Sequence, residues 1–299
     1  MIGQTLQEIR EKKGLSLRGV SKEIISHSQL SRIENGSQIP SADKLFHLLC
    51  RMNIDFDEFC MWMDDDYMNT RTKLNNQVEG ILQKKDPFLM KQLISELDFY
   101  YKKYQDIFFH HMKCVLKAHI WVSTEKNYPQ ARIEVADIAN YLSTIESWFY
   151  YELTLLNHTL FFLEIDQAIA LGNEALYSVE KRYAKFRNGE ITRKLFNNLA
   201  IHTLTDESYY MNSYRYSNAA LGMPQSPAHV YGIAFAKIIN QVACFKLQNG
   251  QYDPDYLAQL VHWFALIGMD DLYAEVQSFL KEHGLHVKLK STRSIVIET

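Results

Sequence analysis

Apolar side chains recur three and four residues apart in five short stretches at the start of the chain. This spacing places them on one face of a helix. Short helices are predicted over residues 2–13, 17–25, 27–34, 41–52 and 55–63. Their apolar positions fit one small core, made of Leu6, Ile9, Leu15, Val20, Ile24, Leu30, Ile33, Leu45, Leu48, Leu49, Ile54, Phe56 and Phe59. An acidic run, Asp64-Asp65-Asp66, follows, so we expect a first domain over residues 1–66.

Residues 87–286 continue the helical period in longer stretches with short connections. Prolines mark several of the expected helix starts, because a proline in the first turn removes no helical hydrogen bond; these are Pro87, Pro129, Pro227 and Pro254. Between the two regions, residues 67–86 are polar and are predicted to form a helical linker. The tail 287–299 leaves the pattern, and its run 294–297 is either a short strand or a frayed end.

A weak internal repeat runs through the second region. Asn157, Asn198 and Asn240 each follow apolar residues, at intervals of 41 and 42 residues, and each is followed by another helical stretch. A period of about 42 residues with two helices per unit is typical of an α-solenoid, in which each helix pair buries its apolar face on its neighbours. We therefore predict an all-α fold, in which a five-helix module precedes a tetratricopeptide-like α-solenoid over residues 87–286.

The composition agrees with long helices and a sizeable core. Of 299 residues, 47% are hydrophobic and 22% are charged, with only 12 Gly and 6 Pro, which disfavours disorder and many-turned β folds. The N-terminal stretch is charged and has no signal-peptide character. The most apolar run, Leu153 to Ile165, is too short and too polar to cross a bilayer. We expect a cytoplasmic protein that has no membrane segment.

The sequence carries no constellation of residues that predicts catalysis or a metal site. Its four cysteines lack CxxC spacing, which disfavours structural zinc and a disulfide framework. His110 and Cys114 lie one helical turn apart, but the pattern offers no third and fourth ligand. P-loop, GxSxG and HExxH motifs are absent. We predict no cofactor and no enzymatic activity.

Residues 16–36 form the strongest local motif, two short helices joined by a tight connection. The major groove of DNA admits such a pair, with the second helix lying in it. Ser26 and Gln29 have the spacing of a capping box at the start of this second helix. Although the net charge of the chain is −3, residues 1–51 hold eight Lys and Arg against five Asp and Glu. Residues 1–66 are therefore predicted to be a helix-turn-helix domain that binds a double-stranded DNA operator.

Three side chains on the outer face of the second helix are candidates for reading bases. His27, Ser28 and Arg32 project together, since residues four apart share a helix face. The guanidinium of Arg32 fits guanine O6 and N7, a contact that discriminates between bases by about 1–3 kcal/mol. Phosphate contacts, which fix register rather than sequence, are predicted for Arg18, Gln29 and Asn35.

Other polar groups of the module are open to a structural interpretation. Arg10 and Glu34 are expected to pair with each other inside the module rather than to touch DNA. His27 and Ser28 could equally be solvated, and the whole module could serve dimerisation alone.

Residues 1–63 resemble the Cro and phage-repressor type of helix-turn-helix, most clearly in the run Ser28-Gln29-Leu30-Ser31-Arg32-Ile33-Glu34-Asn35-Gly36. Joined to helical repeats of this length, the chain resembles the Rgg/GadR/MutR family of bacterial regulators; further matching positions are Pro40, Lys44-Leu45, Leu48-Leu49 and 54–59. The resemblance implies a homodimer whose repeats bind a short secreted signalling peptide after its import, as in quorum sensing. The chain departs from the pattern at Leu17, where related repressors often carry a Gln that contacts the DNA backbone, and Arg18 is expected to serve instead.

The repeated asparagines are candidates for a peptide site on the concave face of the solenoid. A carboxamide both donates and accepts hydrogen bonds, so it can pair with the N–H and C=O groups of an extended peptide. Asn157, Asn198 and Asn240 would form such a clamp, and Lys194 and Lys237, about one turn before two of them, suit a peptide carboxylate. The alternative is that these asparagines cap turns or bond neighbouring helices.

Three hypotheses for function follow from these patterns. The first is a dimeric, sequence-specific regulator whose DNA binding is altered by a bound peptide. The second keeps the DNA-binding domain but makes the repeats a constitutive surface for dimerisation or protein docking. The third is a scaffold that inhibits an enzyme by sequestering it, which the sharp helix-turn-helix motif disfavours.

Overall fold

The computed structural model describes residues 2–63, 65–182 and 189–287. All regular secondary structure in these residues is helical, which confirms the predicted all-α fold. The chain divides into two compact units, Met1–Met112 and Lys113–Thr299. The predicted tail from residue 288 onward lies outside the described residues.

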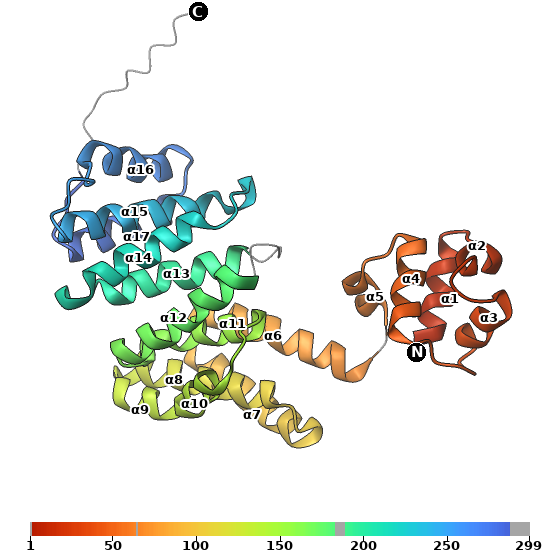
Figure 1. Ribbon diagram of the computed structural model, residues 1–299. Helices are drawn as coiled ribbons and strands as arrows, with labels where there is room; N and C mark the ends of the chain where they lie inside the picture. Colours follow the sequence, from red (N-terminus) through yellow and green to blue (C-terminus); the bar gives the residue numbers. More distant parts are fainter. Residues whose placement is uncertain (1, 64, 183–188, 288–299) are drawn as a thin grey trace, which may run out of the picture. The chain divides into compact units, whose positions relative to one another are not determined.

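The N-terminal end of the first unit contains the five predicted helices (Figure 1). They are α1 (Ile2–Lys12), α2 (Leu17–Ser21), α3 (His27–Glu34), α4 (Ala42–Met52) and α5 (Phe56–Trp62). Helix α2 is shorter than the predicted range 17–25, because Lys22 leaves the helical conformation and Glu23 adopts a left-handed φ of 65°. This early end forms the tight connection that leads into α3.

The core of these five helices follows the predicted apolar positions with one clear error. Leu6, Ile9, Val20, Leu30, Ile33, Leu48, Leu49 and Phe59 are buried, and Met52 joins them. Phe56 was expected in this core, but its side chain is 45% exposed and its ring lies 5.4 Å from that of Phe46. A capping box between Asp55 and Glu58 starts α5 at Phe56, and Phe59, almost one turn later, is the residue that enters the core.

Helix α1 crosses α3 at very close range. A Cβ added to Gly3 would lie 1.8 Å from the backbone oxygen of Ile33 and 2.8 Å from its carbonyl carbon. Because backbone atoms cannot rotate away as a side chain does, only a glycine fits at this crossing.

Residues 67–86, predicted as a helical linker, belong mostly to α6 (Asp66–Lys84), which packs against α7 (Pro87–Tyr104). Leu74 and Val78 of α6 are fully buried, so this helix has an apolar face as well as its polar one. Its assignment as a linker stays a prediction. Helix α8 (Ile107–Glu125) follows and contains the boundary between the two units.

The second unit is a stack of paired helices (Figure 1). They are α9 (Tyr128–Glu134), α10 (Ala136–Thr144), α11 (Tyr150–Thr159), α12 (Ile165–Arg182), α13 (Gly189–Thr203), α14 (Tyr210–Gly222), α15 (Val230–Lys246), α16 (Pro254–Leu266) and α17 (Asp270–Glu282). Short 3-10 turns precede or follow several of them, at Leu160–Phe162, Glu207–Tyr209 and Pro227–His229. As predicted, Pro87 and Pro254 are first residues of helices, and Asp86 and Asp253 cap those helices.

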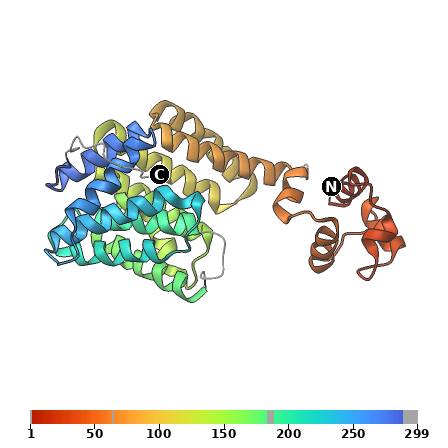
Figure 2. The ribbon, with the colours of Figure 1, turned by 90° about the horizontal axis from the view of Figure 1, so that it is seen from above.

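Helices at equivalent positions of the predicted repeat lie next to each other. Helix α13 packs on both α11 and α15, and α14 packs on both α13 and α15 (Figures 1 and 2). The rings of Phe196 on α13 and Tyr216 on α14 are stacked with centroids 6.3 Å apart, and both side chains are fully buried. The predicted solenoid of helical repeats is thus confirmed. None of the helices in the described part of the chain combines the length and hydrophobicity needed to cross a bilayer.

Candidate nucleic-acid interface and ligand site

Helix α3, the predicted recognition helix, is fixed at its start and along its inner face. Ser26 precedes it in an extended conformation, and its hydroxyl accepts a hydrogen bond of 3.1 Å from the backbone N–H of Gln29. This is the forward half of the predicted capping box. Leu30 and Ile33 point inward and are each 1% exposed. The same device, a hydroxyl of Ser16 accepting from Gly19 N at 3.0 Å, starts α2.

The predicted base-reading residues lie on the opposite, outer face of α3. His27, Ser28 and Arg32 are all exposed, and nothing in the described residues forms an ion pair with Arg32. A flexible cation beside two small polar groups is able to reach the edges of bases in a major groove. Their role in reading bases stays a prediction.

The predicted phosphate contacts have different surroundings. Arg18 is exposed on α2, whereas Gln29 is half-buried at the start of α3. Asn35 is exposed, but its Oδ1 accepts a hydrogen bond of 3.0 Å from Ser37 N. A phosphate would therefore meet the amide nitrogen of Asn35 rather than its oxygen, which is the polarity that an anion requires.

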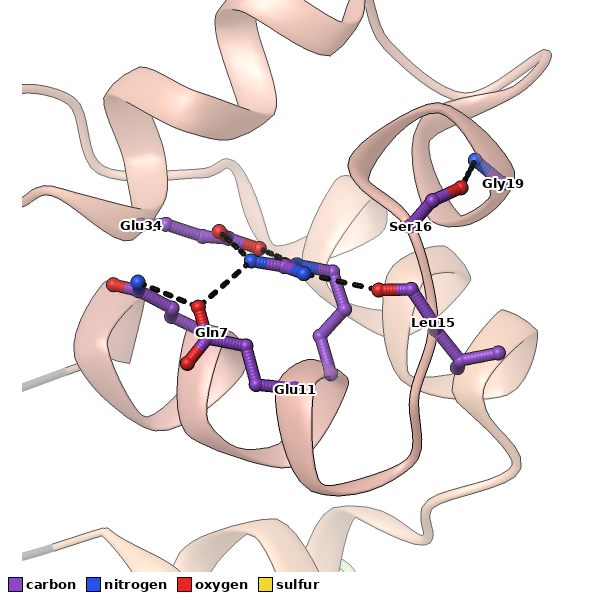
Figure 3. A network of polar contacts seen from close by, with 7 residues as sticks. Gln7, Glu11, Leu15, Ser16, Gly19 and Glu34 are labelled. Carbon is purple, nitrogen blue, oxygen red and sulfur yellow. Dashed lines mark hydrogen bonds and ion pairs between the residues drawn. The ribbon is translucent and has the colours of Figure 1, made fainter.

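Arg10 and Glu34 form the internal pair that the sequence predicted. Arg10 Nε lies 2.7 Å from Glu34 Oε1 and Nη2 lies 2.8 Å from Oε2, in the two-pronged geometry of a strong ion pair. Their side chains are 10% and 6% exposed. Arg10 Nη1 also donates to Leu15 O at 2.9 Å, and Glu11 accepts from both Arg10 and Gln7 (Figure 3).

This network joins α1, the loop after it and the end of α3. The hydrogen bond to Glu34 raises the pKa of Arg10 above its ordinary value. Arg10 and Glu34 are therefore parts of the buried scaffold that holds α1 against α3, rather than surface groups.

In the repeats, the first two predicted asparagines lie side by side. Asn198 Nδ2 on α13 donates to Asn157 Oδ1 on α11 at 2.8 Å. Asn157 is 7% exposed and Asn198 is half-buried. A carboxamide has two donor hydrogens and an acceptor oxygen, so this single bond leaves both side chains able to bind further groups. The bond also fits the alternative role of joining neighbouring helices.

The other predicted ligand residues do not form one continuous row with this pair. Asn240 Nδ2 donates to the buried Ser217 Oγ of α14 at 3.1 Å. Lys237 lines an apolar cavity of about 490 Å³ between α15 and α16, with Val230, Ile233 and Trp263 among its walls. Asn240, the third equivalent repeat position, thus has different surroundings from the Asn157–Asn198 pair.

Lys194 and Asn198 face a second, more enclosed cavity of about 340 Å³ between α13 and the start of α15. Its lining residues are Glu190, Arg193, Lys194, Asn197, Asn198, His229, Tyr231, Gly232 and Phe235. Arg193 and Asn197 were not predicted. The available signal was their position on the same face of α13 as the buried Phe196 and Ala200, where a charged or amide side chain is unusual.

The described residues give little support for a metal site or a reactive cysteine. Within the described ranges, no group of three His, Cys, Asp or Glu side chains is arranged to hold a metal ion. Burial raises the pKa of the Cys114 thiol to about 11, which keeps it protonated and unreactive.

Comparison with known families identifies both regions of the chain. Residues 91–221 match the family model described as the C-terminal domain of the HTH-type transcriptional regulator Rgg, and residues 6–59 match a helix-turn-helix model. The two matches together span more than half of the chain. The chain belongs to the Rgg family of helix-turn-helix transcriptional regulators. It is a DNA-binding regulator of that type.

Solved structures share the fold of this Rgg-family protein over nearly their whole length. The Streptococcus dysgalactiae SHP pheromone receptor Rgg2 has a TM-score of 0.71 and 23% identity, over 94% of this chain and 100% of that one. Bacillus thuringiensis PlcR, in complex with the peptide PapR7 and DNA, has a TM-score of 0.61 and 17% identity, over 92% and 98%. The PrgX/cCF10 complex gives 0.66 and 15%, over 94% and 99%.

Proposed function

We propose that this Rgg-family protein is a homodimeric, sequence-specific regulator whose DNA binding is controlled by a short signalling peptide, as in quorum sensing. In this proposal, residues 1–66 bind the operator, and residues 87–286 form the ligand-binding and dimerisation domain, with the peptide on the concave face of the repeats. Both the operator and an imported peptide are reached in the cytoplasm, where we place the protein.

The observation that carries the peptide proposal is the cavity beside the Asn157–Asn198 pair, whose walls are mostly apolar and include a few polar groups. It lies between two repeats of a helical stack and offers Lys194 and Asn198 to one ligand. Sites of this kind, concave and largely apolar with a few converging polar groups, are typical of small-ligand binding. Two relatives of the same fold, PlcR and PrgX, are solved in complex with PapR7 and cCF10 respectively.

Control by a peptide requires that the peptide bind one arrangement of the protein better than another, since a ligand with equal affinity for both shifts nothing. To change the ratio of two states from 1:99 to 99:1, the affinities must differ by about 10⁴-fold. In a dimer, the two DNA-binding heads (residues 1–66 of each copy) would read two half-sites. The centres of these half-sites lie about one helical turn of DNA, or a multiple of it, apart. A ligand that alters the distance between the heads would therefore alter operator affinity.

The second candidate is a constitutive dimerisation or docking scaffold that has the same DNA-binding head. The hydrogen bonds from Asn198 to Asn157 and from Asn240 to Ser217 favour it, because both are contacts between helices of the repeats.

Native mass spectrometry of the protein purified from its own host separates the two candidates. A dimer that carries a peptide-sized adduct supports the receptor, and fragmentation identifies the peptide. A bare dimer that binds operator with an affinity unchanged by host culture extract supports the scaffold. A bare monomer that binds operator with full affinity would contradict the dimeric, paired half-site arrangement in both.

A further inference from the structure

Arg193 on α13 is a buried cation, and only some of its hydrogen-bond donors are bound within the protein. Its side chain is 1% exposed. Nε donates to Ala220 O at 3.2 Å, and Nη2 donates to Met223 O at 3.1 Å and Pro224 O at 2.9 Å, around the C-terminal end of α14. Nη1 is buried and has no hydrogen-bond partner among the described residues. Two of the five guanidinium hydrogens are therefore unused.

The partners of Arg193 are neutral carbonyl groups, so they do not balance its charge. Burial lowers the pKa of this guanidinium, and among the residues that the structure describes only the carboxylate of Glu190 opposes the effect. Glu190 is exposed, one turn before Arg193 on α13, and makes no ion pair with it within the described residues. A buried cation without a counter-ion costs several kcal/mol of stability. Its presence beside a cavity indicates that an anion from outside the chain completes the site.

Two further unpartnered groups face the same cavity. Asn197 is 4% exposed, and its Nδ2 donates to Gly232 O at 3.1 Å. Within the described part of the chain, the buried Oδ1 of Asn197 and the buried Nδ1 of His229 have no hydrogen-bond partner. An unpaired acceptor repels a bare carboxylate but suits a ligand that carries an N–H close to its carboxylate. Tyr231 and Phe235 provide apolar walls.

We propose that this cavity binds the carboxy-terminal residue of a peptide, with the free carboxylate on Arg193 Nη1 and the terminal amide N–H on Asn197 Oδ1. The cavity volume of about 340 Å³ is near the lower limit for ligand sites and suits one or two residues rather than a whole peptide. This inference rests on the proposed function, because it names the end of the peptide that the repeats recognise. The aromatic walls favour an apolar terminal side chain.

The test uses four small probes and the full-length protein, with affinities from titration by ligand-observed NMR. N-acetylphenylalanine carries all the proposed features. Its primary amide lacks the charge, 3-phenylpropionate lacks the N–H, and the 1-amide of N-acetylaspartic acid carries a side-chain carboxylate instead of a terminal one. We expect the amide to bind about tenfold or more weakly than the acid, because a charge-assisted hydrogen bond is lost. The two other probes should lie between them.

Variants connect the binding to the named residues. Arg193→Met should abolish the difference between acid and amide, and the unrelated exposed cation Arg215→Met should leave it unchanged. Because Arg193 also supports the end of α14, its variant could fail to fold. Glu190→Gln is exposed and removes a competing negative charge, so it should tighten binding of the acid about two- to fivefold.

Equal binding of acid and amide to the wild-type protein, or unchanged acid affinity in Glu190→Gln, would overturn the inference. Tighter binding of the 1-amide of N-acetylaspartic acid than of N-acetylphenylalanine would also overturn it, in favour of an acidic side chain as the anion. A peptide adduct in native mass spectrometry together with any of these results would leave the receptor proposal standing and refute only this mode of recognition.

Discussion

The Arg10–Glu34 pair allows a quantitative test of how the DNA-binding head is held together. Both side chains are nearly buried and their two hydrogen bonds measure 2.7 and 2.8 Å. Removing one partner leaves the other charge buried and unbalanced, which costs about 3–5 kcal/mol in comparable pairs. We therefore expect Arg10→Met and Glu34→Leu each to lower the unfolding free energy of the DNA-binding head by about 3–5 kcal/mol. This is a large share of the 5–15 kcal/mol typical of a whole domain.

The double variant should be less destabilised than the sum of the single ones. Replacing both partners by apolar groups removes the unbalanced charge, so the remaining cost is chiefly the lost donor to Leu15 O. A multidomain chain does not unfold in one step. The suitable assay is therefore hydrogen exchange followed by mass spectrometry on peptides from α1 and α3, in which protection reports local opening free energies.

A matched control is available on the same helix. Glu8 pairs with Lys12 at 2.8 Å, but both side chains are more than half exposed. Glu8→Gln should change protection by less than about 0.5 kcal/mol, since solvent screens such pairs. If Arg10→Met behaved like Glu8→Gln, or if the two single losses were additive in the double variant, the buried pair would not be what fixes α1 to α3.

Five further substitutions test the DNA-binding head and the repeats. Arg32→Ala should weaken operator binding by about 1–3 kcal/mol and relax the base preference at one position, measured by fluorescence anisotropy on operator variants; an unchanged preference would refute a base-reading role. Asn198→Ala should lose the response to peptide while operator affinity is kept. A parallel loss of both would show that this residue is structural. Asn240→Ala should have a weaker effect on the response to peptide, since Asn240 is hydrogen-bonded to Ser217. Gly3→Ala should destabilise the head by about 1–3 kcal/mol, because its Cβ would meet a backbone oxygen at 1.8 Å. The control is Gly80→Ala in helix α6, where an added Cβ meets no described atom within 4 Å; it should stabilise the protein by up to about 1 kcal/mol. Thermal unfolding that showed Gly3→Ala and Gly80→Ala to have the same effect would contradict the crossing geometry.

The head could be predicted from sequence because its determinants are local. Helix periodicity, the hydroxyl of Ser26 before α3 and the complementary charges of Arg10 and Glu34 are all readable within a short stretch. Phe56 was misplaced because periodicity gives the apolar positions of a helix but not the point where the helix starts. Its capping box sets Phe56 at the first residue, where the side chain faces outward.

The ligand site was predictable only in part, because it depends on which side chains meet across repeats. Asn157 and Asn198, 41 residues apart at equivalent repeat positions, are hydrogen-bonded to each other, and their role in holding a peptide stays a prediction. The repeat interval could not show that Lys194 and Lys237 face different cavities, since this depends on the neighbours of each helix. The unbalanced charge of Arg193 is visible only when its surroundings are known.

The crossing at Gly3 and the ion pair at Arg10, about two helical turns apart on α1, both hold the last turn of α3, at Ile33 and Glu34. A surface held in this way meets DNA already ordered and has little conformational entropy to lose on binding. It also has little freedom to change shape in response to a distant ligand. A peptide bound in the repeats would then change the operator affinity and the spacing of half-sites that the dimer binds. The bases that the DNA-binding head prefers would stay the same with or without the peptide.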